Sequence, residues 1–298
     1  MTKLPAPVTR KTVSAALYAA VAGSLLFAPA ATAGILTPEG GGSPNADKIQ
    51  SLYILVSLMG LVVFLAVEGV LLWSLYKFKA RKGRVAAQIH GNTRLEIGWT
   101  VGAALILVVL TVITFIMLPG IQNPEASGPA GLAAAQGVQY AATDQPPPPG
   151  GKGLNIKVVG QQYLWRYDYP GPGRLFAYHT MVVPTDTTVT LDITSADVQH
   201  SFWIPELFGK ADAVPGKIND MWFKVTEEGT YRGNCAELCG ENHAQMIGMV
   251  KAVSPEAYRN WVARQRADID ASTRALVEQR RRLQSGTPGP GTANTPPQ

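Results

Sequence analysis

The chain has 298 residues, of which 46% are hydrophobic and only 16% are charged, and its net charge is +5. This composition excludes a disordered chain rich in charge, and the two cysteines are too few for a disulfide-stabilised scaffold. A mean hydropathy of +0.07 suits a membrane anchor joined to a soluble domain.

The first 33 residues have the pattern of an export signal. Lys3, Arg10 and Lys11 provide a positively charged start, an apolar stretch follows, and Ala31-Thr32-Ala33 matches a small-x-small cleavage site. We therefore predict a signal peptide over residues 1–33. The alternative is an uncleaved first membrane helix, which the short and alanine-rich apolar stretch disfavours.

Two long apolar runs predict a transmembrane helical hairpin within residues 50–120. The runs, Leu52–Tyr76 and Ile97–Leu118, are long enough to cross a hydrocarbon core of about 30 Å. Glu68 lies within the first run, where a carboxylate is either functional or close enough to the helix end to reach water.

The segment between the two runs carries positive charge and has no acidic residue before Glu96. Because positive loops stay in the cytoplasm, this pattern predicts a cytoplasmic loop and an extracytoplasmic location for everything after residue 119. The basic residues of the loop are Lys77, Lys79, Arg81, Lys82, Arg84 and Arg94.

The remainder divides into a linker, a β-rich segment and a C-terminal helix. Residues 121–153 are rich in Gly, Pro and Ala, which predicts a linker, and residues 154–254 suggest a sandwich or small barrel. A Ser-Pro-Glu start signal predicts a helix over 255–284, and we expect disorder over 285–298. The predicted strands are Leu154–Val159, Tyr163–Tyr169, Phe176–Val183, Thr187–Thr194, Ile218–Thr226, Tyr231–Asn234 and Met246–Val253.

The β-rich segment is mildly acidic and has no cluster of Lys and Arg interleaved with aromatic residues. We therefore expect no nucleic-acid partner. The whole chain contains no C-x-x-C-H motif, so we expect no fused c-type haem.

Metal-binding residue types concentrate in one short segment. Cys235, Cys239, His243 and Met246 have the spacing C-x3-C-x3-H-x2-M, and His200 lies upstream at the start of a probable strand. Thiolate, imidazole and thioether together favour copper, whereas Mg and Ca prefer oxygen and structural Zn uses Cys and His without Met. Two thiolates can bridge two metal ions, each of which then takes one His.

A disulfide between Cys235 and Cys239 is the structural alternative for an exported protein. The loop that it would close is small, so it would gain little chain-entropy stabilisation. The neighbouring His and Met residues favour the metal site over the disulfide.

These features resemble subunit II of the haem–copper cytochrome c oxidases, of bacterial type. The resemblance covers about residues 50–260 and rests on the hairpin, on LEIGWT at 95–100, on QYLWRYDY at 162–169 and on the metal motif. It implies an α+β membrane protein of the bacterial inner membrane. A two-helix transmembrane hairpin would be followed by a periplasmic cupredoxin-like Greek-key β-barrel.

By this resemblance, the metal motif is a dinuclear copper centre of the CuA type. The implied ligands are the bridging Cys235 and Cys239, with His200 and Met246 on one copper and His243 and the carbonyl of Glu237 on the other. The Glu237 side chain would also reach a Mg or Mn ion shared with subunit I.

The resemblance also implies the route of electrons and protons. The centre would accept electrons from cytochrome c, or from a c-type cytochrome domain, and pass them to haem in subunit I. Dioxygen is reduced to water there with proton pumping, so the chain would be one subunit of an oxidoreductase and translocase. Subunit III and membrane lipid are further expected partners.

Five positions in the resemblance concern donor docking and the entry of electrons and protons. Trp165 matches the aromatic segment, but Tyr163 stands where the family usually has the tryptophan through which electrons enter, which leaves the donor open. Asp168 and Asp197 match acidic positions near the docking face. Glu96 matches an acid at the entrance of a proton-uptake route, and its alternative is an ordinary interfacial carboxylate.

Three other classes of protein share part of this pattern. A quinol oxidase subunit II has the hairpin and barrel but lacks copper ligands. A copper-delivery protein with a C-x3-C pair normally has one span and no methionine at this spacing, and nitrous oxide reductase carries a similar copper loop in a longer soluble chain. Copper stoichiometry and co-purification with a haem-bearing subunit distinguish the oxidase from the delivery protein.

Overall fold

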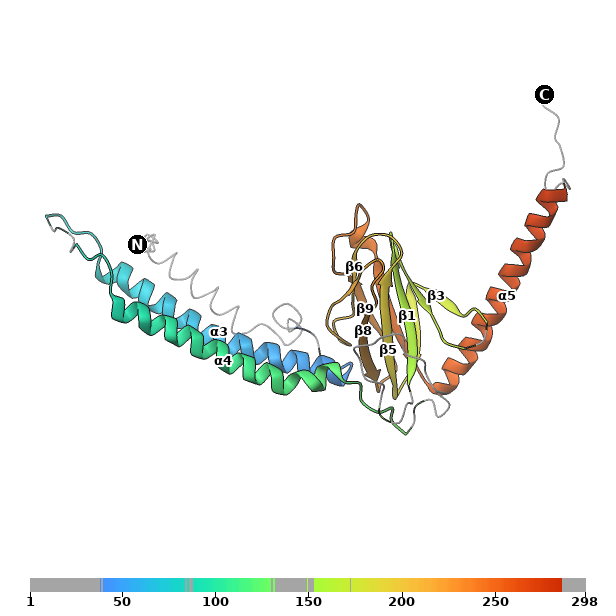
Figure 1. Cartoon of the computed structure of the whole chain (residues 1–298), viewed down its shortest axis with the longest axis horizontal. Coiled ribbons are helices and arrows are strands. Elements are labelled where there is room, and N and C mark those ends of the chain that lie inside the picture. Colours follow the sequence, from blue (N-terminus) through green and yellow to red (C-terminus); the bar gives the residue numbers. More distant parts are fainter. Residues whose placement is uncertain are drawn as a thin grey trace, which may run out of the picture.

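The computed structural model describes residues 38–285, apart from 39, 84, 86–87, 130, 132–148, 150–152 and 172. The predicted signal peptide over 1–33 lies outside the described residues, as do residues 286–298 of the predicted tail and most of the predicted linker. The described part consists of two long helices, a β domain and a C-terminal helix (Figure 1).

The two long helices lie side by side as an antiparallel hairpin (Figure 1). They are α3, Pro44–Lys77, and α4, Thr93–Gln122. Asn92 caps α4, because its side-chain oxygen accepts a hydrogen bond of 3.2 Å from the Leu95 N–H. The most apolar stretch of each helix has no buried residue, and both are long and apolar enough to cross a membrane. Long apolar helices whose side chains are not buried by protein require lipid around them, so the predicted hairpin is confirmed.

The β domain follows as two five-stranded sheets within the described residues. One sheet has the order β3-β2-β1-β5-β8 and the other has the order β4-β10-β9-β6-β7. The chain moves repeatedly from one sheet to the other, as it does in Greek-key sandwiches, and the predicted cupredoxin-like fold class is confirmed. The strands are β1 Leu154–Gln161, β2 Leu164–Asp168, β3 Phe176–Tyr178, β4 Thr180–Pro184, β5 Thr187–Ser195, β6 His200–Trp203, β7 Ala211–Ala213, β8 Asn219–Val225, β9 Gly229–Cys235 and β10 Ile247–Val253.

One predicted strand, Phe176–Val183, is two strands in the structure. His179 has a φ of 59°, a left-handed conformation that cannot continue an extended strand. The chain therefore leaves one sheet after β3 and enters the other at β4. Strand β7 was not predicted, because its three residues are too few to show an alternating pattern.

Aromatic side chains fill the space between the two sheets. Trp165 and Tyr167 point inward from β2, and both are fully buried. The Phe202 ring packs against Trp165 with ring centroids 4.8 Å apart and against Phe208 with centroids 5.6 Å apart. Close-packed aromatic rings resist rearrangement, so this core gives the strand that begins at His200 a rigid support.

Strand β8 joins the β domain to the hairpin. The Trp222 ring is fully buried, and its Nε1–H donates a hydrogen bond of 2.8 Å to the carbonyl of Ile121, at the end of α4. The Asn45 side chain, at the start of α3, donates a hydrogen bond of 2.6 Å to the carbonyl of Trp222. The two ends of the hairpin are therefore tied to the same residue of the β domain.

Glu125 adds an ionic contact at this junction. Its carboxylate lies 3.2 Å from the ammonium of Lys48 on α3 and 3.2 Å from that of Lys224 on β8. Burial alone would raise the pKa of Glu125, but the hydrogen bonds and charges of the two lysines outweigh it and hold this pKa below its usual value. The ionised carboxylate therefore stabilises the junction.

We predict that Glu125→Gln makes the folded chain less stable at pH 7 by less than about 1 kcal/mol, because all three side chains are partly exposed. A carboxyl whose pKa is lowered by folding contributes stability above its unfolded pKa of about 4.3 and loses it as the pH falls through the folded value. The difference in the free energy of unfolding between the variant and the wild type should thus shrink below about pH 4. Denaturant unfolding between pH 3 and 8 measures it, with the exposed Glu228→Gln as the control. A difference that grows on acidification would contradict this account.

The C-terminal helix α5, Pro255–Ser285, begins at a capped end, where the Ser254 hydroxyl accepts a hydrogen bond of 3.2 Å from the Ala257 N–H. Its first half packs on the β domain, with Tyr258 buried and the Trp261 ring 5.0 Å from the Tyr169 ring. All side chains from 270 to 285 are exposed. The helix extends from the side of the β domain opposite the hairpin (Figure 1).

Candidate metal centre

The candidate centre is built on the connection between β9 and β10. Strand β9 ends at Cys235, and the connection returns to the same place, because the Cys235 N–H donates a hydrogen bond of 3.0 Å to the carbonyl of Met246. Gly240 has a φ of 134°, a conformation that other residues rarely adopt. A short 3-10 turn, His243–Gln245, completes the loop. We call residues 236–246 the metal loop.

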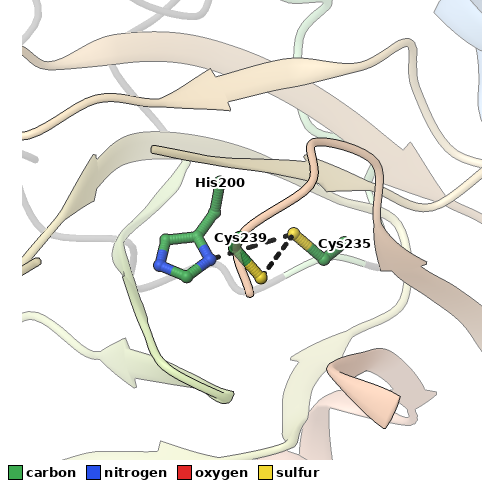
Figure 2. A group of neighbouring side chains, drawn as sticks. All are labelled: His200, Cys235 and Cys239. Atoms are coloured by element: carbon green, nitrogen blue, oxygen red, sulfur yellow. Dashed lines mark hydrogen bonds between the residues drawn. The ribbon is translucent and has the colours of Figure 1, made fainter. Parts of the chain in front are cut away.

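Two sulfurs and one imidazole from different elements meet at the base of this loop. Figure 2 shows the side chains of His200, Cys235 and Cys239 converging on one point. The Cys235 Sγ lies 3.9 Å from the Nδ1 of His200 and 3.9 Å from the Sγ of Cys239. Strand β6 supplies the histidine, and the end of β9 and the metal loop supply the cysteines.

Three further donor atoms predicted from the sequence lie beside these sulfurs. The Cys239 Sγ is 3.6 Å from the Nδ1 of His243 and 3.8 Å from the Sδ of Met246. The carbonyl oxygen of Glu237 is 3.2 Å from the Cys235 Sγ. Glu237 itself is exposed.

The two cysteines are free thiols and not a disulfide. A disulfide would require a separation of about 2.05 Å between their sulfurs, whereas the observed separation is 3.9 Å. Metal–thiolate bonds are about 2.3 Å long. Because 3.9 Å is less than twice that length, both sulfurs can bind the same ion.

The cluster is shielded from water. His200, Cys235, Cys239 and Met246 are all buried. Burial, together with the neighbouring Cys235 sulfur, raises the pKa of the Cys239 thiol to about 11. Without a cation the Cys239 sulfur therefore stays protonated at neutral pH, and a bound metal ion would supply the positive charge that stabilises its thiolate.

Asp197 orients the His200 ring. Its Oδ1 lies 2.8 Å from the Nε2 of His200, and its Oδ2 accepts a hydrogen bond of 2.7 Å from the Gln162 N–H. Burial alone would raise the pKa of Asp197, but these bonds and the Val198 N–H outweigh it and keep this pKa below its usual value. A carboxylate on Nε2 favours the tautomer that leaves Nδ1 free as a metal ligand, and Nδ1 is the atom that faces Cys235.

This donor set fits copper. It combines two buried thiols, the buried His200 imidazole and the buried Met246 thioether with the partly exposed imidazole of His243. Soft sulfur ligands select copper or zinc, but structural zinc sites are completed by Cys and His alone, whereas here the Met246 sulfur also lies within 3.8 Å of a cysteine sulfur.

The other residues singled out in the sequence lie at different distances from the cluster. Trp165 is fully buried, and its ring packs edge-on against the His200 ring with centroids 5.8 Å apart. Tyr163 is partly exposed, and its hydroxyl accepts a hydrogen bond of 3.1 Å from the Glu241 N–H in the metal loop. Glu96 lies on the first turn of α4, and α4 begins at the end of the hairpin that is remote from the β domain (Figure 1).

Sequence reasoning missed the contacts that Asp197 and Gln162 make with the ligands. Asp197 was matched only to a docking face, although its position three residues before His200 is compatible with a contact to that ring. Gln162 was noted only as the first residue of the aromatic segment at 162–169, because it reaches Cys239 only through the folding of two loops that are distant in sequence. Asp168, the other acidic match, forms an ion pair of 2.6 Å with Arg166.

Comparison with known proteins gives the family. Residues 31–117 match the family model of the transmembrane domain of cytochrome c oxidase subunit II, and residues 171–253 match that of its periplasmic domain. The chain is 34% identical to cytochrome c oxidase subunit 2 of Alkalihalophilus pseudofirmus over 250 residues, which are 83% of this chain and 66% of that protein. It is 33% identical to cytochrome c oxidase subunit 2 of Cereibacter sphaeroides over 276 residues, and the match covers 77% of this chain and 82% of that protein.

A crystal structure of the periplasmic domain of a cytochrome oxidase subunit II from Bradyrhizobium japonicum is 32% identical in sequence and has a TM-score of 0.38. The match covers 39% of this chain and 96% of that one. The family models correspond to the apolar hairpin and to most of the β domain that carries the donor cluster, which makes the chain a membrane protein with an extracytoplasmic C-terminal domain. The resemblance noted in the sequence is thus confirmed, and the chain belongs to the family of cytochrome c oxidase subunit II.

Proposed function

We propose that this chain is the electron-entry subunit of its oxidase and that the donor cluster binds a dinuclear CuA centre. The observation that supports this most is the convergence of every predicted donor atom on the two cysteine sulfurs. The proposed ligands are Cys235, Cys239, His200, His243, Met246 and the carbonyl of Glu237.

When bound, copper would supply the one-electron chemistry. The chain's own residues keep the ligands in place: Cys235 is fixed to Met246 through the backbone, and His200 begins a strand supported by packed aromatic rings. Ligands that are held in place and kept dry change their geometry little when the charge changes, which favours rapid electron transfer.

The remaining parts of this role involve partners. We propose that electrons pass from the centre to haem in subunit I, where dioxygen is reduced to water with proton pumping, and that subunit III completes the complex. The exposed carboxylate of Glu237 is suited to a Mg or Mn ion shared with subunit I, because its backbone already touches the cluster while its side chain is free to reach outward.

We further propose a two-pass topology in the bacterial inner membrane, with the basic loop between α3 and α4 in the cytoplasm. Glu96 would then lie at the cytoplasmic surface, where proton uptake begins. In the structure it also accepts a hydrogen bond of 3.3 Å from the Asn92 N–H, so the same carboxylate helps to cap α4. Glu68 is half-buried on α3.

Tyr163 is the proposed contact for the electron donor, because it is partly exposed while Trp165 is fully buried. We predict that Tyr163→Ala slows reduction of the copper centre by cytochrome c about tenfold, which corresponds to about 1.4 kcal/mol in activation free energy. Stopped-flow reduction at equal copper content measures the rate. Tyr163→Phe keeps the ring and should react nearly as the wild type does, as should Tyr178→Ala, which removes an exposed ring on β3. An unchanged rate in Tyr163→Ala would place the entry point elsewhere.

Copper stoichiometry and co-purification test the proposed function. The full chain is isolated from membranes through an affinity tag, and copper and haem are counted per chain. The proposal predicts two coppers per chain and a haem-bearing membrane subunit in the same complex. One copper per chain, or the absence of the haem-bearing subunit, would favour copper delivery instead.

A further inference from the structure

The turn between β1 and β2 touches the donor cluster from outside the metal loop. This turn consists of Gln162 and Tyr163, which lie between the ends of the two strands. Both residues are hydrogen-bonded to elements that carry proposed copper ligands. The inference below rests on the proposed copper function and concerns how the chain holds its ligands.

The side chain of Gln162 is bonded to one of the two cysteines. Its Nε2 donates a hydrogen bond of 2.6 Å to the carbonyl oxygen of Cys239. The same Nε2 lies 3.5 Å from the Tyr163 hydroxyl, which in turn accepts from the Glu241 N–H at 3.1 Å. The turn therefore holds the metal loop at two points, on either side of Gly240.

The backbone of Gln162 reaches the other side of the cluster. Its N–H donates a hydrogen bond of 2.7 Å to the Oδ2 of Asp197, and the Oδ1 of Asp197 lies 2.8 Å from the Nε2 of His200. The Asp197 carboxylate is fixed further by the Val198 N–H at 2.7 Å. One residue of the turn is thus connected to a thiolate ligand through its side chain and to an imidazole ligand through its backbone.

The metal loop needs such support, because most of it is exposed. Residues 237, 238 and 240–242 are all exposed. In the part of the chain that the structure describes, Gln162 and Tyr163 supply the hydrogen bonds that reach residues 237–242 from outside the segment 235–246. Without the Gln162 bond, the segment that carries Cys239 would be held mainly by its own internal contacts.

We propose that Gln162 is a positioning residue for the copper centre. Its side-chain amide is bonded to Cys239, and its backbone N–H is bonded to Asp197, which contacts His200. These two groups fix the distance between the segments that carry Cys239 and His200, which come from different loops of the fold. The thiolates and the imidazole therefore already have their spacing before copper binds, and the loop does not open readily once copper is bound.

The variant Gln162→Leu separates the two contacts, because it removes the side-chain amide and leaves the backbone N–H to Asp197. The full chain, in detergent and loaded with copper, should still bind two coppers but lose them to a chelator roughly tenfold faster, as is typical when a residue that orients a metal ligand is replaced. Its electron paramagnetic resonance spectrum should show an altered copper hyperfine pattern. Gln161→Leu makes the same change at the neighbouring exposed residue and should match the wild type in both measurements.

A second variant tests the hydrogen bond itself. Gln162→Glu has nearly the same shape but presents a carboxylate oxygen in place of the N–H donor, so it should lose copper at least as fast as Gln162→Leu. Wild-type rates and spectra in both variants would overturn the inference, and so would an effect in Gln162→Leu alone, because that pattern would reflect packing. A wild-type chain that fails to bind two coppers would instead contradict the proposed function, and the inference would fall with it.

Discussion

Cys235→Ser is expected to abolish the two-copper centre. A serine hydroxyl is a harder ligand than a thiolate and has a far higher pKa, so it cannot replace a sulfur that bridges soft metal ions. The Cys235 sulfur also lies close to three other donors, the His200 ring, Cys239 and the Glu237 carbonyl. Copper content and the electron paramagnetic resonance spectrum of the purified full chain measure the effect.

The companion variant and the control make this test specific. Cys239→Ser should give the same loss, because the two sulfurs play equivalent bridging parts in the proposed centre. Ser201→Ala changes a buried residue directly after His200, and its hydroxyl has no hydrogen-bond partner among the described residues. This control should keep both coppers. A dinuclear spectrum that survives in Cys235→Ser would refute the proposed ligand set.

Trp222→Ala is expected to have the largest effect on stability. Replacing a buried aromatic residue by alanine typically costs about 3–5 kcal/mol, because the surrounding side chains fill the cavity only in part. Trp222 is fully buried and also donates the hydrogen bond to Ile121 that joins the β domain to α4. Its loss should therefore lower the free energy of unfolding of the β domain and loosen the attachment of that domain to the hairpin.

Denaturant unfolding of the full chain in detergent, followed by circular dichroism, measures this cost. Trp222→Phe is the matched variant, because it keeps most of the buried volume but loses the Nε1–H donor, and it should cost less than the alanine. Trp73→Ala removes an exposed ring on α3 and should have little effect on the β domain. A Trp222→Ala chain as stable as the wild type would show that the junction does not depend on this ring.

The parts of the fold that the sequence predicted are those determined by local pattern. Long apolar runs define the two helices because their length decides whether they can span lipid. The start of α5 was predictable because Ser254 caps its own helix. The donor residues from 235 to 246 could be recognised because one short loop carries four of them at fixed spacing, and the structure brings these residues together with His200, which is 35 positions away from Cys235.

The parts that the sequence did not predict depend on contacts between distant segments. The break at His179 follows from a backbone conformation that residue type does not reveal, and β7 exists only because it pairs with β6. Trp165 and Tyr163 are two positions apart in one motif, yet only the fold decides that the first is buried against His200 and that the second faces the surface. The bonds of Gln162 arise in the same way.

Electron paramagnetic resonance of the copper-loaded wild-type chain tests the central claim most directly. Two bridging thiolates would share one unpaired electron between two copper nuclei. We therefore predict two coppers per chain and a hyperfine pattern to which both nuclei contribute equally. A pattern from a single copper nucleus, or a metal-free chain in which Cys235 and Cys239 form a disulfide, would contradict the assignment of this cluster as the electron-entry site.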